Sequence, residues 1–80
     1  MHEEKMDVIG AFGETLRKLM LKHGFTQEQL GFEAGLRRTF ISSLELGDKQ
    51  PSLVTIQKLA VVFNLSISKF LAEVEKTHLK

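Results

Sequence analysis

Residues 26–47 read TQEQLGFEAGLRRTFISSLELG, and this stretch decides the fold. Thr26 is a good helix cap, and Gln29, three residues later, completes a capping box with it. Leu30 begins the buried face of the helix that follows. Gly35 ends this helix, because glycine adopts a left-handed backbone at almost no steric cost. The pattern therefore predicts a short helix followed by a tight turn.

A second short helix is predicted after the turn, from Arg37 to Glu45. Leu36 is apolar directly after the turn and is expected to fill the corner between the two helices. Ile41 and Leu44 have the spacing of a buried helix face, and Gly47 stops the helix. Two short helices that cross steeply at a tight turn form a helix-turn-helix unit, which places its second helix in the major groove of DNA.

These residues resemble the Cro/C1-type (Xre) helix-turn-helix family of transcriptional regulators. Residues 35–42 are similar to the same segment of the controller proteins of restriction–modification systems, and the resemblance covers roughly residues 12–70. It implies a lambda-repressor-like fold that binds double-stranded DNA. The matching positions are Thr26, Gln27, Leu30, Ala34, Gly35, Leu36, Ile41, Ser42, Leu44, Glu45, Gly47, Pro51, Ser52 and Leu53.

The composition limits what else the chain can be. Eighty residues form one small domain, and the absence of cysteine excludes disulfides and thiolate metal sites. The net charge is only +1, so any basic surface must be local. The longest apolar run, residues 59–63, is too short to span a bilayer, and we expect a cytoplasmic, nucleoid-associated protein. No nucleophile–base pair, cofactor motif or metal-ligand spacing is present, so we predict no enzyme activity, cofactor or metal.

Helical periodicity before and after this stretch predicts a compact, all-α domain of five helices. We expect residues 1–6 to be a flexible N-terminal tail, residues 7–76 to form the domain and residues 77–80 to be a flexible C-terminus. Thr55 is expected to face solvent. The expected buried positions of the other three helices are Phe12, Leu16, Leu19 and Met20, then Leu53, Ile56, Leu59, Ala60 and Phe63, and last Ile67, Phe70, Leu71 and Val74.

Two arginines, Arg37 and Arg38, begin the second helix of the unit, although cations at a helix N-terminus oppose the helix dipole. Arginine matches the O6 and N7 acceptors of guanine, which favours a role in reading DNA. For Phe40 a partly buried core position stays open, and for Lys49 an ordinary surface turn stays open. The full set of expected DNA contacts is Gln27, Arg37, Arg38, Thr39, Phe40, Ser42, Ser43, Lys49 and Gln50.

Glu45 ends the second helix and is expected to be structural. In the family, this glutamate usually pairs with an arginine of the first helix, but Met20 occupies the matching position here. Two other partners stay open, namely Arg17 and the backbone N–H groups of the following loop.

The last helix carries more apolar side chains than one face can hide, which favours a homodimer interface. The expected interface residues are Ile67, Phe70, Leu71 and Val74, with Leu53 or Phe63 as possible neighbours. The open alternative is that Phe70 and Leu71 cover the core of the monomer.

The prediction that follows is a sequence-specific regulator of transcription, acting as a homodimer on a pseudo-palindromic double-stranded DNA operator. The resemblance to controller proteins suggests that it controls a restriction–modification operon and its own gene. It also suggests RNA polymerase as a partner, because related regulators carry an acidic residue at the position of Glu28. Two alternatives stay open, a phage-type repressor and an antitoxin-like protein-interaction module.

Overall fold

A computed structural model describes residues 7–79, which form five α-helices and contain no strand. The all-α, five-helix prediction is confirmed. The predicted N-terminal tail, residues 1–6, lies outside the described residues. The helices are α1 (Val8–His23), α2 (Gln27–Ala34), α3 (Arg38–Glu45), α4 (Leu53–Val62) and α5 (Ile67–Leu79).

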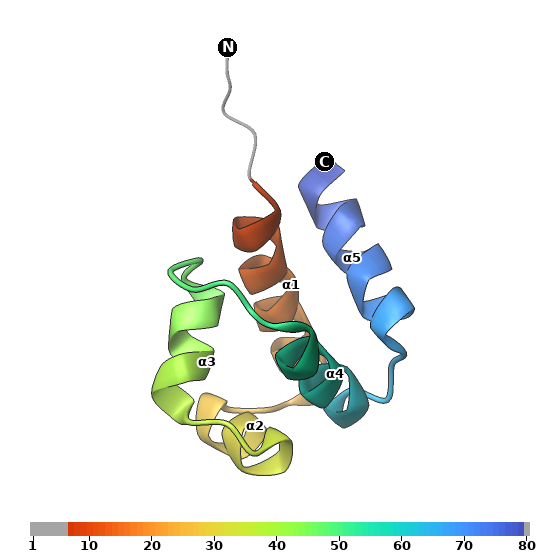
Figure 1. The fold of residues 1–80 in the computed structure, drawn as a ribbon. Coiled ribbons are helices and arrows are strands. Elements are labelled where there is room, and N and C mark those ends of the chain that lie inside the picture. The colour runs from red at the N-terminus through yellow and green to blue at the C-terminus, as the bar shows by residue number, and fades with distance from the viewer. Residues whose placement is uncertain (1–6, 80) are drawn as a thin grey trace.

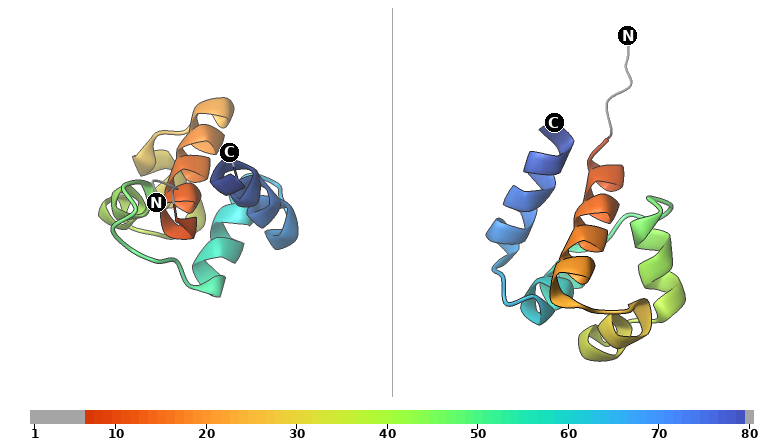
Figure 2. Two further views of the ribbon diagram at one scale, coloured as in Figure 1. Left: turned by 90° about the horizontal axis from the view of Figure 1, so that it is seen from above. Right: turned by 180° about the vertical axis from the view of Figure 1, so that it is seen from behind.

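The first helix, α1, runs through the middle of the molecule, with α3 on one side and α5 on the other (Figures 1 and 2). It contacts both of these helices, while α2 contacts α3 and α4, and α4 contacts α5. The chain therefore forms two halves about α1, which we call the α2–α3 half and the α4–α5 half.

The helices begin where the sequence places their caps. The side chain of Asp7 accepts a hydrogen bond from the first turn of α1. Thr26 and Gln29 form the predicted capping box, with bonds of 2.9 and 3.0 Å. Ser52 accepts the N–H of the third residue of α4. Gly35 has a φ of 71°, so the turn after α2 uses the left-handed backbone that glycine permits.

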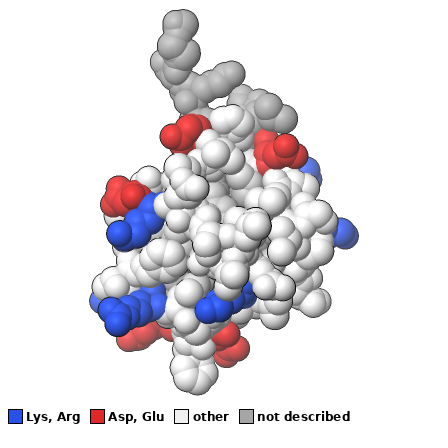
Figure 3. Space-filling model, viewed as in Figure 1, with Lys and Arg blue, Asp and Glu red and all other residues white. Residues whose placement is uncertain are grey.

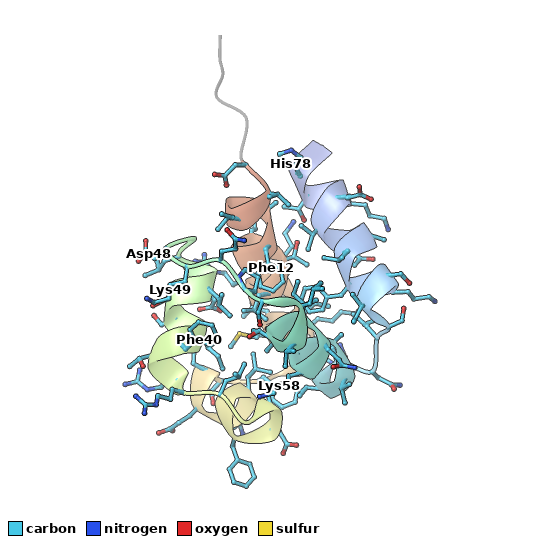
Figure 4. All side chains as sticks on the ribbon, viewed as in Figure 1. Phe12, Phe40, Asp48, Lys49, Lys58 and His78 are labelled. Carbon is cyan, nitrogen blue, oxygen red and sulfur yellow. The ribbon has the colours of Figure 1, made fainter. Side chains whose placement is uncertain are left out.

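Aromatic rings fill the core between α1, α4 and α5. Phe12 stacks on Phe70 with ring centroids 5.2 Å apart, and Phe63 lies 6.5 Å from Phe70. Phe12 lies in the middle of the molecule in Figure 4. The buried apolar set is Ala11, Phe12, Leu16, Met20, Leu30, Ala34, Ile41, Leu44, Ile56, Leu59, Ala60, Phe63, Phe70 and Val74.

Two predictions about α4 are wrong. Leu53 is 72% exposed, because it starts the helix and its side chain does not reach the core. Thr55 is buried instead, since it lies on the same helix face as Leu59, four residues later. Its hydroxyl accepts a hydrogen bond from the hydroxyl of Ser52, which satisfies a polar group that would otherwise be costly to bury.

The last helix is longer than predicted. Residues 77–79, part of the predicted flexible C-terminus, are helical, because α5 continues through Leu79, and residue 80 lies outside the described residues. Its last turns are tied to α1, because the buried hydroxyl of Thr15 donates to Thr77 Oγ1 at 3.1 Å. The hydroxyl of Thr77 donates in turn to the carbonyl of Glu73 at 3.2 Å. The contact between Thr15 and Thr77 joins the end of α5 to the middle of α1.

Among the described residues, no single helix has both the length and the apolar character needed to cross a membrane. Only α4 and α5 taken together meet that test, and a bend of 96° separates them.

Candidate nucleic-acid interface

Glycines let α3 pack with its backbone directly against its neighbours. A Cβ atom added to Gly13 of α1 would collide with the carbonyl oxygen of Leu44 and lie 2.6 Å from that of Glu45. A Cβ atom on Gly31 of α2 would lie 2.5 Å from the carbonyl oxygen of Leu36. Only a residue without a side chain permits these contacts, so close backbone packing holds the end of α3 on α1 and the turn before α3 on α2.

The inner face of α3 is apolar and the outer face is polar. Ile41 and Leu44 are fully buried, as predicted. Arg37 has extended backbone angles and makes no capping hydrogen bond, so α3 begins at Arg38, one residue later than predicted. The capping bond is missing because the guanidinium of Arg37 is only a donor and offers no acceptor to the free N–H groups of the first turn. Arg38 and Thr39 are exposed on that turn.

An open groove runs along the outer side of α3, and we call it the α3 groove. Phe40 of α3 and Lys49 of the following loop lie on this side of the molecule in Figure 4. Arg37 and Lys49 supply positive charge, and none of the described residues that line the groove is acidic. The residues that line it are Gly35, Leu36, Arg37, Thr39, Phe40, Ser43 and Lys49.

The expected contact residues divide between this groove and its surroundings. Phe40 is half-buried and packs against the core, which was the alternative left open for it, and its side chain also lines the groove. The hydroxyl of Ser43 donates to the carbonyl of Thr39 at 3.1 Å, which leaves its oxygen as an acceptor. Ser42 is half-buried and Gln50 is exposed, and neither lines the groove.

Gln27, at the start of α2, is held by Glu45 at the end of α3. Its Nε2 donates to Glu45 Oε1 at 2.7 Å, and the pair is partly buried. Among the described contacts Glu45 has this partner, whereas Arg17 and the loop N–H groups were the candidates from the sequence. The pair was missed because the two residues are 18 positions apart. The available signal was Met20, which leaves Glu45 in need of another donor.

The predicted interface residues of α5 do not lie together on the surface. Phe70 and Val74, which are four residues apart on one helix face, are both buried in the core, so the open alternative holds for Phe70 and neither residue is available on the surface of the monomer. Ile67 and Leu71 are half-buried. Exposed apolar side chains occur instead on α4, and Figure 3 shows a mostly white area in the middle of this face with a blue patch at its lower edge, where Figure 4 labels Lys58. The exposed apolar residues of α4 are Leu53, Val54 and Val61.

Comparison with known proteins agrees with this architecture. A family model described as helix-turn-helix matches residues 16–70. The control protein C.MunI of Mycoplasma sp is 32% identical over 88% of this chain and 96% of its own length. The crystal structure of the restriction–modification controller protein C.AhdI from Aeromonas hydrophila superposes with a TM-score of 0.74 at 35% identity, over 78% of this chain and 94% of that one.

A longer relative matches over only part of its length. The HTH-type transcriptional regulator PuuR of Escherichia coli (strain K12) is 34% identical over 80% of this chain. The match spans 35% of PuuR, so the chain corresponds to about a third of that regulator.

Proposed function

We propose, from the premise that this chain belongs to the Cro/C1-type helix-turn-helix family, that it regulates transcription by reading double-stranded DNA with α3. The observation that carries the proposal is the α3 groove, where Arg37, Thr39 and Lys49 line an open surface without an acidic residue. An exposed helix that begins with donors such as Arg38 and Thr39 suits the major groove. The controller-protein relatives support the same assignment.

Each part of this surface has a distinct role in the proposal. Arg38 contacts guanine with its two-pronged guanidinium, and Thr39 and Phe40 contact neighbouring base edges and thymine methyl groups. Lys49 contacts the phosphate backbone from the loop. Gln27 still has one N–H after its bond to Glu45, and this N–H contacts a phosphate together with the free backbone N–H groups of α2. The cations are few, so binding depends on their placement rather than on net charge.

The chain acts as a homodimer in this proposal. Leu53, Val54 and Val61 of α4 supply the exposed apolar surface, and Ile67 and Leu71 border the core on α5. A two-fold contact holds two recognition helices about 34 Å apart, one turn of DNA, which requires a pseudo-palindromic operator. The kinship with controller proteins supports a restriction–modification operon and the chain's own gene as targets, at the nucleoid in the cytoplasm.

Selection of binding sites from random DNA, followed by footprinting upstream of the chain's own gene, tests the DNA-binding function. We expect a pseudo-palindromic site, and an affinity that falls linearly with the logarithm of salt concentration. Equal affinity for the selected site and for random DNA contradicts the proposal. A tight one-to-one protein partner with no selected site favours the antitoxin-like alternative.

Sedimentation of Val61→Glu and Leu71→Glu at micromolar concentration tests the dimer. We expect both variants to be folded and to show a lower dimer fraction than the wild-type chain, because a charge is then placed in an apolar contact. Leu21→Glu is the matched control, since Leu21 is 75% exposed and belongs to α1 rather than to α4 or α5. If both variants dimerise like the control, the interface lies on another face.

A further inference from the structure

A groove with a volume of about 330 Å³ lies between α1 and α5, which run side by side in both views of Figure 2. We call it the α1–α5 groove. It is on the side of α1 that faces away from α3 (Figure 1). The described residues that line it include none from the α3 groove and none from the proposed dimer contact. Its size is that of a small-molecule site, and neither DNA nor a second copy of the chain covers it in the proposed function.

The inner part of the α1–α5 groove is apolar, and its two walls are joined. Leu19 of α1 and Leu65 of the connection before α5 line it, and both are half-buried against the core. Thr15 and Thr77 also line it, and the hydrogen bond of 3.1 Å between their hydroxyls links α1 to α5. The walls are therefore held at a fixed distance, so little ordering is needed when a molecule binds between them.

The outer part of the α1–α5 groove is cationic. Three exposed lysines line it, Lys18 and Lys22 of α1 and Lys76 of α5, whereas Glu73 is the single acidic side chain among the described residues that do so. Lys76 Nζ lies 3.5 Å from Glu73 Oε2, and Lys18 Nζ lies 3.7 Å from a carboxylate outside the groove, that of Glu14. Lys22 forms no ion pair with another described residue. Exposed ion pairs of this kind are weak, so these ammonium groups can turn toward an anion in the groove.

An apolar floor beside a cationic edge matches a molecule that has both characters. An apolar body gains free energy when the leucines remove it from water, and a carboxylate gains charge-assisted hydrogen bonds from the lysines. An inorganic anion makes no use of the floor, and an uncharged apolar molecule makes no use of the lysines. The DNA backbone is anionic but has no apolar body, and α1 separates the groove from the helix that is proposed to read DNA.

We propose that the α1–α5 groove binds a small organic acid with an apolar body, such as an aromatic carboxylate. The body lies against Leu19 and Leu65, and the carboxylate lies between the lysines of the two helices. The bound molecule bridges α1 and α5 and so stabilises the folded domain. This site goes beyond the proposed function and does not depend on it, because the chain alone carries every residue involved.

The experiment is a calorimetric titration of the full chain, without DNA, with naphthoate as the probe. Naphthamide, which has the same rings and no charge, is the matched probe, and we expect naphthoate to bind about tenfold more tightly. The double variant Lys18→Gln/Lys22→Gln should bind naphthoate about tenfold more weakly and naphthamide as before. The control is Lys58→Gln/Lys69→Gln, which changes the net charge equally at exposed lysines that do not line the groove. It should bind both probes like the wild-type chain.

Amide NMR shifts locate the bound probe, and we expect them in residues 15–22 of α1 and residues 73–77 of α5. The midpoint of thermal unfolding should also rise with naphthoate, and rise less for Lys18→Gln/Lys22→Gln than for the control. Equal affinity for naphthoate and naphthamide, or equal losses in the two double variants, would show that the groove lysines do not hold a carboxylate. Shifts confined to α4 would place the probe on the exposed apolar side chains there. Either result, or no binding at millimolar naphthoate, overturns the proposal.

Discussion

The two halves of the molecule are attached to α1 by different means. Gly13 of α1 lets the backbone at the end of α3 lie directly against α1, and within the α2–α3 half Gly31 does the same for the turn before α3. In the α4–α5 half, Phe70 stacks on Phe12 and side chains fill the space between the helices. Backbone contacts tolerate little displacement, whereas buried aromatic side chains supply most of the hydrophobic free energy. The comparison indicates that the first half sets the position of α3 and the second half stabilises the domain.

The two halves also differ in the chemistry of their exposed surfaces. The α3 groove is polar and carries the cations Arg37 and Lys49, while the exposed side of α4 carries Val54 and Val61. A polar, cationic surface is suited to DNA, and an apolar one is suited to a copy of the same chain. The residues that contact DNA and those that contact a second copy of the chain can therefore change independently, provided that α1 holds the two halves in the same relative position.

The largest effect is expected for Phe70→Ala. Removing this fully buried ring should lower the free energy of unfolding by about 3–5 kcal/mol, measured by urea denaturation. For such a small domain, this is a large part of the total stability. The fraction that stays folded should bind the operator almost normally, since α3 keeps its backbone contacts. The control is Lys69→Ala, at the exposed neighbouring position. If Phe70→Ala lowers the free energy of unfolding no more than this control does, the aromatic rings do not stabilise the domain.

Compared with Phe70→Ala, Gly13→Ala is expected to cost less stability and more operator affinity. The added methyl group collides with the end of α3, which should cost about 1–3 kcal/mol of stability even though alanine favours helices. The operator affinity of the folded fraction should fall more than for Phe70→Ala, because α3 must move. Circular dichroism measures the folded fraction, and a titration with operator DNA measures affinity. A net gain in stability with normal affinity would show that the contact does not position α3.

Local signals in the sequence were sufficient for most of the fold. Caps such as Thr26 and Ser52, and the turn at Gly35, depend on residues within one turn of each other. The apolar faces of α1 and α3 follow helical spacing in the same way. The position of the α3 groove was largely predictable too, because its residues are consecutive or nearly so.

Features that depend on distant residues were not predictable. The bond from Gln27 to Glu45, and the bond from Thr15 to Thr77 at the end of α5, each join separate helices. Apolar residues are also ambiguous in sequence, since Leu53 is exposed and Phe70 buried in helices with similar patterns. Which of them faces the core depends on helix packing, and that is a three-dimensional property.

Arg38→Ala tests the surface of the α2–α3 half without disturbing its packing. The residue is exposed, so stability should stay within about 0.5 kcal/mol of the wild-type value. Discrimination at one base pair of the operator should fall by about 1–3 kcal/mol, measured with single-base operator variants. Lys49→Ala is the matched comparison, and it should weaken binding to all sequences equally and lower the salt slope by about one. Uniform weakening by Arg38→Ala would assign that residue to phosphate instead.

The smallest effect is expected at the polar link between α1 and α5. Thr15→Val removes a buried donor and leaves Thr77 still bonded to the carbonyl of Glu73, so we expect a loss of about 0.5–1.5 kcal/mol. Thr77→Val should cost slightly more, because it leaves the buried hydroxyl of Thr15 without its acceptor. The double variant should cost less than the sum of the two, since both changes remove the same bond. Urea denaturation of the three variants measures these differences. Losses comparable to that of Phe70→Ala would mean that hydrogen bonding, rather than the aromatic rings, stabilises the α4–α5 half.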